Sequence, residues 1–479
     1  MTQITPIRVP TGERGAVPSP ELIARYGKPG PRYTSYPPAP HWSGAYGESD
    51  YSEALAELGQ QSGREVSLYV HVPFCSRRCT FCACNVLISR EHETGRSYVE
   101  TVLAEMDLVL HAAGGGQPRV CQMHWGGGTP TWLSAPDLEY LCRGIEERFA
   151  LLPNREQSIE VDPRVTTPEQ LAVLRAAGLN RLSMGVQDFD PKVQAAIHRD
   201  QSVEQTLAII ESARALGIQA INMDLVYGLP FQSVDSFIAT VDKVIEQGAD
   251  RVALYNFAYL PERLQHHRGI EREWLPDAAT RVDLFRAASA QFQQAGYVMI
   301  GLDHFAKGTD ELAQSQRDGT MQRNFMGYTT RAGRDLLAFG VSSISRVGRD
   351  FAQNVKNTDT YKRAIASGRL PIERGLRLTE EDLAREQAIQ SLMCYGITRL
   401  DQVRERSGLD LLADPAAKAR LDELASDGLI EWDRDVVRAT SLGRYFLRNI
   451  AMVFDAYLAR TVHEEVRGRP VQVRFSSTI

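Results

Sequence analysis

Four of the seven cysteines lie within ten residues, in the segment YVHVPFCSRRCTFCAC. Cys75, Cys79 and Cys82 follow the pattern C-x3-C-x2-C, and Cys84 comes two residues later. Three thiolates on one short loop can bind three irons of a [4Fe–4S] cluster and leave the fourth iron open to a ligand from outside the protein. A structural zinc ion usually takes four protein ligands, often from two C-x2-C pairs. Cys84 could supply the fourth ligand, but the sequence has no second pair and no nearby His-x3-His, so the spacing favours the cluster.

Six short apolar segments predict buried strands, and the first of them ends just before the cysteines. The expected strands are 67–72, 121–125, 158–162, 181–186, 220–228 and 251–257. Each is followed by a segment with helical periodicity, and the expected helices are 96–111, 135–149, 167–177, 202–215, 233–247 and 277–295. Six strand–helix units in succession predict a parallel β/α architecture. A further apolar run at 297–305 adds a strand or a lid.

Polar or glycine-rich segments stand at the carboxyl ends of these predicted strands. They are the cysteines after the first strand, Gly126–Thr129 after the second, Glu160 and Asp162 after the third, Gln187 after the fourth, Asp224 after the fifth and Asn256–Ala258 after the sixth. In parallel barrels the carboxyl ends of the strands share the face where the chemistry gathers. The three consecutive glycines would let the backbone approach a ligand closely. A single acid at a strand end is commonplace, whereas polar groups at successive ends predict one site.

The pattern divides the chain into three parts. Residues 1–66 are rich in Pro, Gly and Tyr and predict an extended arm followed by a helix near 50–60. Residues 67–365 hold the barrel and an extension. Residues 366–479 are mainly helical, with Thr379 as an expected N-cap, and include a helix at 412–428, a hairpin at 429–440 and a final helix at 441–461. Helices followed by a hairpin resemble a winged-helix module, but the mixed charge favours a packing or lid role.

The composition excludes several classes of protein. The 479 residues are 43% hydrophobic and 24% charged, which is typical of a globular chain with a full core. The net charge of -6 gives no basic excess that would indicate nucleic acid as a partner. We find no apolar run that would span a bilayer and no apolar signal segment, so we expect a cytoplasmic protein. Apolar surroundings predict core positions for Cys121, Cys142 and Cys394, and we expect structural roles for His124, His198 and His304.

The C-x3-C-x2-C motif after the first strand resembles the signature of radical S-adenosylmethionine (SAM) enzymes. Cys84 and several spaced segments narrow the resemblance to the oxygen-independent coproporphyrinogen III dehydrogenases. The segments are PRYTSYP (31–37), HWGGGTPT (124–131), IEVDPR (159–164), LSMGVQDF (182–189), MDLVYGLP (223–230) and RNFMGYTT (323–330). The resemblance covers about residue 22 to the end of the chain. It implies an α/β fold: a partial (β/α)6 TIM-like barrel with an N-terminal arm and a mainly helical C-terminal domain.

The resemblance also implies a set of ligand-binding residues. Cys75, Cys79 and Cys82 would hold the [4Fe–4S] cluster, and Cys84 would not be an iron ligand. Two SAM molecules would share the site. The residues implied for the cluster-bound SAM are Tyr69, Gly127, Glu160 and Ile344. Those implied for the second SAM are Phe81, Gly128, Thr129, Gln187, Arg199, Asp224 and Ala258.

The implied reaction is the oxidative decarboxylation of two propionates of coproporphyrinogen III to vinyls, giving protoporphyrinogen IX, by way of a 5′-deoxyadenosyl radical. The implied partner is a low-potential electron donor such as flavodoxin or ferredoxin, and we expect a monomer. From the arm we expect Arg32 and Tyr33 to bind substrate, because a cation and a hydroxyl suit propionates. Alternatives are a haem chaperone or another tetrapyrrole-acting radical SAM protein on the same scaffold; Cys84 and the arm favour the dehydrogenase.

Overall fold

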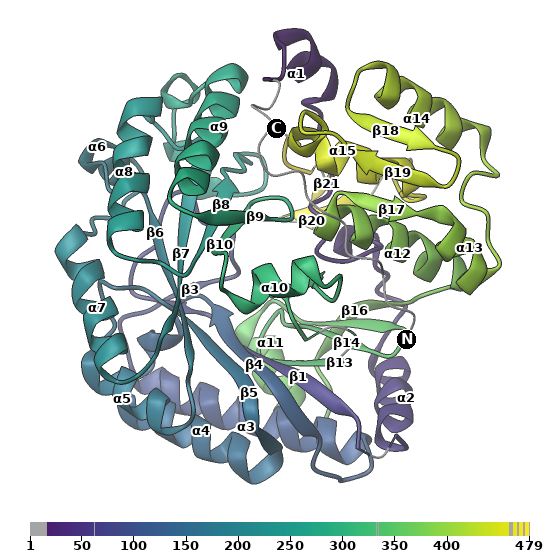
Figure 1. The fold of residues 1–479 in the computed structure, drawn as a ribbon. Helices are drawn as coiled ribbons and strands as arrows, with labels where there is room; N and C mark the ends of the chain where they lie inside the picture. The colour runs from purple at the N-terminus through teal and green to yellow at the C-terminus, as the bar shows by residue number, and fades with distance from the viewer. Residues whose placement is uncertain are drawn as a thin grey trace.

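A computed structural model describes residues 17–61, 63–331, 333, 335–458, 463–466, 469–472 and 475–478. Residues 1–16 of the expected arm lie outside this set. One sheet of twelve strands dominates the fold, in the order β16-β15-β14-β13-β1-β4-β5-β6-β7-β8-β10-β9 (Figure 1). No helix among the described residues is long and apolar enough to cross a membrane.

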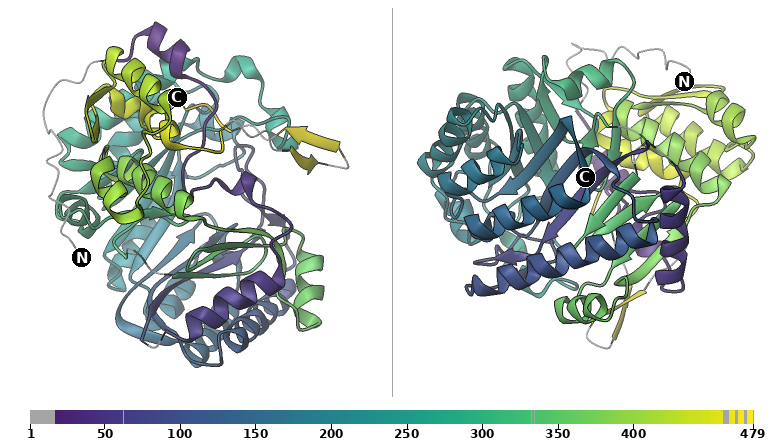
Figure 2. Two further views of the ribbon diagram at one scale, coloured as in Figure 1. Left: turned by 90° about the vertical axis from the view of Figure 1, so that its right-hand side faces the viewer. Right: turned by 90° about the horizontal axis from the view of Figure 1, so that it is seen from below.

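Six neighbouring strands of this sheet are parallel and follow chain order, which confirms the predicted β/α architecture. They are β1 (Glu65–Val72), β4 (Arg119–Gly127), β5 (Ala150–Val161), β6 (Arg181–Gln187), β7 (Ala220–Tyr227) and β8 (Arg251–Asn256). The helices after them are α3 (Glu93–Ala112), α4 (Ala135–Arg148), α5 (Pro168–Ala176), α7 (Val203–Ala215), α8 (Val234–Glu246) and α9 (Ala278–Gln294). These helices cover the outer face of the curved sheet (Figure 2).

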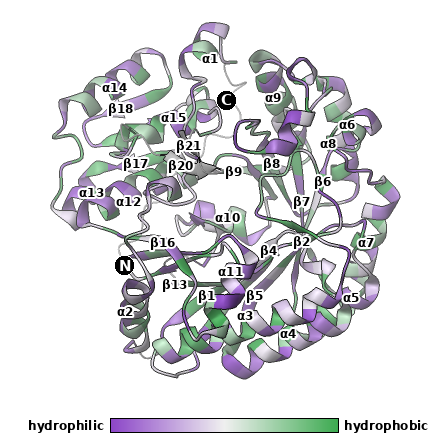
Figure 3. Ribbon diagram, turned by 180° about the vertical axis from the view of Figure 1, so that it is seen from behind, coloured by the Kyte–Doolittle hydropathy of each residue, from purple (hydrophilic) through white to green (hydrophobic). Residues whose placement is uncertain are grey.

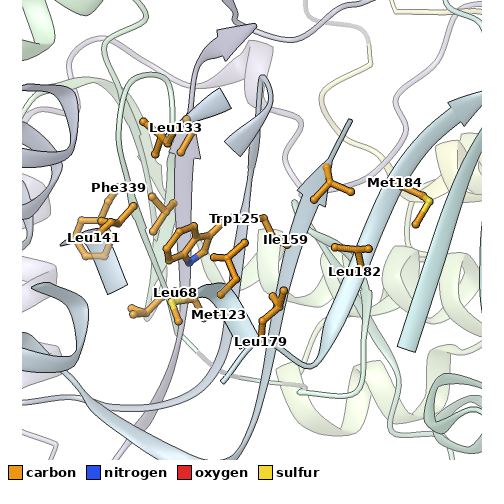
Figure 4. Packing of buried hydrophobic residues seen from close by; sticks show 14 of the residues in the cluster. Leu68, Met123, Trp125, Leu133, Leu141, Ile159, Leu179, Leu182, Met184 and Phe339 are labelled. Atoms are coloured by element: carbon orange, nitrogen blue, oxygen red, sulfur yellow. The ribbon is translucent and has the colours of Figure 1, made fainter. Parts of the chain in front are cut away.

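The core lies between the strands and these outer helices. Leu68, Trp125 and Ile159 come from adjacent strands, and Leu141 of α4 packs from outside, all nearly inaccessible to solvent (Figure 4). The strands are correspondingly hydrophobic, whereas the outer helices carry mixed residues (Figure 3). Most of these helices begin at a polar cap: Ser134, Thr167, Ser202 and Ser233 each accept a backbone N–H bond. Such caps fix where each helix begins and therefore limit the freedom of the loop before it.

The half-barrel is extended at both edges rather than closed. On one side β13 (Asp335–Phe339) is parallel to β1, and three antiparallel strands continue outward: β14 (Ile344–Val347), β15 (Asp350–Asn354) and β16 (Ile372–Arg377). The large sheet therefore extends past residue 365, where we placed the end of the barrel part. On the other side, the apolar run at 297–305 forms strands rather than a lid: β9 (Tyr297–Ile300) pairs with β10 (His304–Lys307), and β10 pairs with β8.

Polar contacts lie at the amino ends of several strands. Asp310 and Glu311, at the start of α10 (Glu311–Arg317), form ion pairs with Arg251 of β8, and Glu311 also pairs with Arg181 of β6. The hairpin of β11 (Gln322–Asn324) and β12 (Gly327–Thr329) reaches the sheet interior, where Gln122 donates to Thr329. These contacts close part of the amino-end side of the barrel, opposite the carboxyl ends where the polar segments lie.

The C-terminal part lies beside the barrel (Figure 1) and contains α12 (Glu380–Tyr395), α13 (Leu400–Ser407) and α14 (Pro415–Ser426). Thr379 caps α12, as predicted. The predicted hairpin is also present, because β18 (Ile430–Asp433) pairs with β19 (Val436–Ala439), and β17 (Ile397–Arg399) pairs with β19.

The continuous final helix predicted over 441–461 is wrong. The only α-helical turn in its described part is α15 (Leu447–Ala451), which lies between short 3-10 turns and ends before an extended Asp455; residues 459–461 lie outside the described set. Tertiary contacts with the arm compete with the helix here. Tyr33 donates to the Asp455 carboxylate, and Tyr36 accepts from the Ala456 backbone N–H.

Candidate active site

The cysteine loop follows β1 directly and is fixed by backbone hydrogen bonds. Cys75 ends β2 (Phe74–Cys75), which pairs with β3 (Leu87–Ile88) on the far side of the loop. Between them, Thr80 donates from its backbone to Ile197 at 3.1 Å and from its hydroxyl to Ala196 at 3.1 Å. Both bonds tie the loop to the segment after β6. The loop therefore has a defined shape from the fold itself.

Positive charge gathers beside the buried Cys79. Arg164 Nη2 lies 3.8 Å and Arg199 Nη1 lies 3.7 Å from the Cys79 sulfur. Both arginines also contact Asp162, at 2.6 Å and 3.5 Å. Burial acts to raise the pKa of Asp162, but Arg199 and Arg164 outweigh it and hold that pKa below its ordinary value. Two cations and one anion leave one net positive charge beside the sulfur.

This environment fits an iron–sulfur cluster with thiolate ligands. Among the described residues, no three His, Cys, Asp or Glu side chains converge as they would around a single metal ion. Instead, three thiols lie along one loop next to a net positive charge, and the Cys75 sulfur is 3.5 Å from the Thr129 hydroxyl. Cys84 is exposed, and its thiol, hydrogen-bonded to Cys82, lowers the pKa of Cys82 to about 7. A loop of soft thiolate donors beside cations suits an anionic cluster.

The glycines after β4 are required by close contacts. A Cβ on Gly126 would lie 2.9 Å from the Glu160 carboxylate, and one on Gly128 would lie 2.6 Å from the Phe74 carbonyl oxygen. Gly127 has φ +115, a conformation that favours glycine. The Gly128 N–H donates to Val72 at 2.8 Å, so this loop runs directly along the start of the cysteine loop.

The residues implied for the first SAM come together, mainly on β1, β4 and β5. Glu160 accepts hydrogen bonds from the Gly127 N–H at 3.1 Å and from His124 Nε2 at 3.4 Å. Tyr69 stacks on the His124 ring with 5.9 Å between centroids. The Glu160 side chain keeps 44% of its surface accessible, so its oxygens can accept bonds from ligand hydroxyls. Ile344 begins β14, beside the carboxyl end of β13, and therefore lies at the same edge of the sheet.

The residues implied for the second SAM follow on β6, β7 and the loops beyond. Arg199 Nη2 donates to the Gly185 carbonyl at 2.6 Å, and a Cβ on Gly185 would lie 2.5 Å from Gln187 Nε2. Asn222 donates to Asp224 at 2.8 Å, and burial together with the charge of Glu160 raises the pKa of Asp224 to about 7. The remaining implied residues lie nearby in the chain or fold: Phe81 in the cysteine loop, Gly128 and Thr129 after β4, and Ala258 after β8.

The two arm residues have different positions. Arg32 donates to the Asn256 carbonyl at 3.3 Å and lies over the Tyr255 ring, which places it at the carboxyl end of β8. Tyr33 is 1% exposed and donates to Asp455 at 2.9 Å, so it does not line the barrel mouth in this structure. Our expectation that Tyr33 contacts substrate is therefore corrected, because its hydroxyl is used to attach the arm to the C-terminal part.

Three residues important to this geometry were not recognised as such from the sequence. Asp162 was noted only as a strand-end acid, Arg164 was quoted only within a motif, and His124 was taken as structural. His124 contacts Glu160, Tyr69 and, at 2.7 Å, the Ser158 hydroxyl. The available signal was their position at strand ends beside residues already selected. The expected core cysteines Cys121, Cys142 and Cys394 are buried, as predicted.

Comparisons with known proteins agree with this arrangement. Residues 69–244 match the family model of the Radical SAM superfamily. This segment contains the cysteine loop, the second half of β1 and the next four parallel strands, β4 to β7. The half-barrel, the loop and this match define a radical SAM protein. The solved coproporphyrinogen III oxidase from Escherichia coli, described as a radical SAM enzyme, is 38% identical with a TM-score of 0.85, over 92% of this chain and 100% of that chain.

Curated relatives narrow the class further. The oxygen-independent coproporphyrinogen III oxidase of Pseudomonas aeruginosa is 41% identical over 441 residues, which are 91% of this chain and 95% of the relative. The protein of the same name from Escherichia coli K12 is 41% identical over 453 residues, 94% of this chain and 98% of the relative. The chain belongs to the family of oxygen-independent coproporphyrinogen III oxidases.

Proposed function

We propose that this chain oxidises coproporphyrinogen III to protoporphyrinogen IX without oxygen, as a step of haem biosynthesis. Each of two propionates would become a vinyl group by losing carbon dioxide, one hydrogen atom and one electron. The observation that carries this proposal is a cysteine loop and a glycine loop at one edge of a half-barrel, in a chain that resembles oxidases of that name over nearly its whole length.

The residues at the site indicate how the cofactors would be held. When bound, a reduced [4Fe–4S] cluster and SAM supply a 5′-deoxyadenosyl radical that takes a hydrogen atom from a propionate side chain. Cys75, Cys79 and Cys82 would hold the cluster, with Arg164 and Arg199 balancing its negative charge. The remaining first-SAM set of Tyr69, Gly127, Glu160 and Ile344 would orient the ligand at the barrel mouth.

We propose two SAM molecules per chain. The support is that Gln187 at the end of β6, Arg199 in the segment after β6 and Asp224 on β7 lie on other parts of the barrel than Glu160 on β5. Arg199 and Asp224 bring both charges to a second ligand. Anaerobic equilibrium dialysis of the cluster-loaded protein should give two SAM bound per chain, and Gln187→Ala with Asp224→Asn should reduce this to one. One SAM per unmodified chain would refute the second site.

The reaction is tested by anaerobic turnover. Purified cluster-loaded protein is given coproporphyrinogen III, SAM and dithionite, and porphyrins are separated after oxidation. Protoporphyrinogen IX and 5′-deoxyadenosine should both accumulate, and Cys79→Ser should yield neither. Formation of 5′-deoxyadenosine with coproporphyrinogen III left intact would show a radical SAM protein with a different substrate.

We also propose that the electron comes from an acidic low-potential carrier such as flavodoxin or ferredoxin, which docks beside the cysteine loop. Leu87 and Ile88 are 42% and 39% exposed, although β3 pairs directly with the strand that holds Cys75. Residues 76–90 contain three arginines and no acid, in a chain of net charge -6. An exposed apolar pair within a basic rim suits an acidic protein partner.

A matched pair of variants tests this docking face. Leu87→Glu places a charge on the face, and Leu207→Glu does the same at the similarly exposed (38%) Leu207 of α7. Turnover with reduced flavodoxin should fall for Leu87→Glu alone, while turnover with dithionite should match the unmodified protein for both. Equal flavodoxin rates in the two variants would place the docking face elsewhere.

We propose finally that the protein acts as a cytoplasmic monomer. Its described cysteines are all free thiols, which suits a reducing compartment. Only five large hydrophobic side chains are strongly exposed among the described residues, and two of them belong to the proposed docking face. Light scattering of the cluster-loaded protein should give about the chain mass of 53.4 kDa.

A further inference from the structure

A small cavity of about 40 Å³ lies where the barrel, the arm and the C-terminal part meet. Its walls include Tyr227 and Asn256, the last residues of β7 and β8. Four arginines line it: Arg32 from the arm, Arg281 from α9, and Arg444 and Arg448 from the C-terminal part. A cavity needs about 10–15 Å³ to hold one water molecule, so this one has room for a group of a few heavy atoms but not for a pyrrole ring.

The charge in this cavity is not balanced. Asp303 is the one acid in its wall, 3.7 Å from Arg32, and it also binds His304 at 2.8 Å. Arg281 and Arg444 make no side-chain hydrogen bond or ion pair with any described residue, and Arg281 Nε is buried without a partner. Four arginines therefore line a cavity with a single carboxylate, which is already shared between Arg32 and His304.

Arg448 does not relieve this imbalance. Its guanidinium donates to backbone carbonyl oxygens of Pro31 at 3.0 Å and Ser477 at 2.7 Å, and also to Gly30, so its hydrogen bonds hold chain segments rather than an anion. Burial and the charge of Arg32 lower the pKa of Arg448 to about 9, and burial also lowers the pKa values of Arg281 and Arg444. Burial therefore disfavours the charged form of each of these arginines, and a bound anion would stabilise it.

We propose that this cavity binds a carboxylate of the substrate, one propionate of coproporphyrinogen III, through Arg281 and Arg444 with Arg32 at its entrance. The inference rests on the proposed function and assigns part of the binding site within it. A guanidinium fork matches a carboxylate with two parallel hydrogen bonds, and two unpaired forks meet here. The macrocycle would stay outside the cavity, toward the ends of β7 and β8, where the strands open to the barrel mouth.

The four arginines come from three different parts of the chain, so a bound anion would also affect how these parts are held together. The arm, α9 and the C-terminal part each contribute at least one arginine, so a bound carboxylate would offset the repulsion between three separate parts of the chain. Substrate binding would then favour the observed position of the arm. A free inorganic anion offers similar chemistry to the cavity, and the experiment must distinguish it from a propionate.

Arg281→Gln and Arg444→Gln each remove one charge and keep a polar side chain. Arg286→Gln is the matched control, since Arg286 lies on the same helix as Arg281, is half-exposed and pairs with Asp283 at 3.2 Å. In anaerobic turnover with dithionite we expect the KM for coproporphyrinogen III to rise about 10- to 100-fold for each cavity variant, as for a lost charge-assisted hydrogen bond. The KM of the control, the cluster content and SAM binding should not change, and Arg281→Lys should restore part of the affinity.

A binding measurement without turnover separates the remaining outcomes. Coproporphyrin III, the oxidised form of the substrate that keeps all four propionates and is not turned over, should raise the melting temperature of the unmodified protein and not that of Arg281→Gln. Inorganic phosphate at the same concentration should raise the melting temperature of neither protein. Stabilisation by phosphate with an unchanged KM in the variants would mean a free-anion site and would overturn the proposal. A lower melting temperature with an unchanged KM would mean a purely structural cluster and would also overturn it. If the unmodified protein itself failed to turn over coproporphyrinogen III, the proposed function would fail instead, and coproporphyrin binding would still report on the cavity.

Discussion

Replacing Arg164 by Met should lower the reduction potential of the cluster. Arg164 contributes one of the two cations beside Cys79, and its removal leaves Arg199 and Asp162, whose charges cancel. The net charge next to the sulfur falls from about one positive to none. An electron added to the cluster would then lose an attractive neighbour, so reduction becomes harder and the potential becomes more negative.

The distance sets the upper limit of this effect. Two unit charges about 4 Å apart interact by about 4 kcal/mol at an effective dielectric constant near 20, and Arg164 lies 3.8 Å from the Cys79 sulfur. For a one-electron couple, about 1.4 kcal/mol corresponds to about 59 mV, so the limit is about 170 mV. The cluster charge is spread over several atoms farther away than this sulfur, and the shift should therefore be some tens of millivolts.

The assay is an anaerobic potentiometric titration of the cluster followed by electron paramagnetic resonance, which does not depend on turnover. Arg164→Lys keeps the charge and should keep most of the potential. Arg175→Met on the outer helix α5, where the side chain binds backbone carbonyls, should leave the potential unchanged. A potential that stayed within about 10 mV in Arg164→Met, with iron content intact, would refute the electrostatic role of this arginine.

Three other changes test separate parts of the site. Cys82→Ser should lose the iron and the colour of the cluster, because a hydroxyl is a poor ligand for cluster iron, whereas Cys84→Ser should keep both; equal iron loss would make Cys84 a ligand. The pKa of Asp224 is raised to about 7, so its carboxyl is mostly neutral at pH 6 and mostly ionised at pH 8. SAM carries positive charge at its ammonium and sulfonium groups, so its affinity for the second site should rise about tenfold from pH 6 to pH 8. Calorimetry should show this rise for the unmodified protein and no change with pH for Asp224→Asn. Deleting residues 1–37 should keep the cluster and first-site SAM binding but abolish decarboxylation, and near-normal turnover of a soluble deletion variant would exclude a substrate role for the arm.

The parallel strands were predictable because each is a buried apolar run between turn residues. The run at 121–125 became β4 over Arg119–Gly127, and most of the others differ by one or two residues at an end, but the run at 158–162 became β5 over Ala150–Val161, which begins eight residues earlier. Among the outer strands, β13 (DLLAF) is also a buried apolar run, but it was not recognised as a strand, whereas β16 lacks such a signal. β16 reads IERGLR and has only one buried residue, since it is the edge of the sheet and pairs with a single strand apart from an isolated bridge to Ser43. A short edge strand has few apolar positions to fill, so its sequence resembles a loop.

The prediction of the final helix failed for a different reason. The segment 441–461 contains enough apolar residues at helical spacing to predict one helix, and periodicity reports local preference alone. Arg448 is 3% exposed because it donates to carbonyls more than four hundred positions earlier in the chain. Those contacts fix the backbone where the arm passes, and the helix breaks into short turns on either side. A long-range contact of this kind leaves no periodic trace in the sequence.

For the same reason, the strand residues of the candidate site could be predicted from the sequence, whereas the arm residues could not. Positions such as Glu160 on β5 and Asp224 on β7 could be selected from the sequence. The carboxyl ends of parallel strands meet at one edge of the sheet, and this does not depend on the conformation of the loops. The positions of Arg32 and Tyr33 could not be predicted in this way, because adjacent residues of an arm point in opposite directions, and only the packing decides which one faces the barrel. Here φ +50 at Tyr33 turns its ring into the core formed with the C-terminal part.

That packing makes the arm and the C-terminal part act together at the barrel mouth. Tyr33 and Tyr36 hold the arm to Asp455 and Ala456, while Arg448 holds the carbonyls just before Arg32. A radical generated at the mouth must be kept from solvent until it meets the propionate. An arm that is anchored through buried bonds and presents a single cation to the mouth can close over a carboxylate without carrying water in with it. Substrate charge, rather than a flexible loop alone, would then determine when the site is sealed.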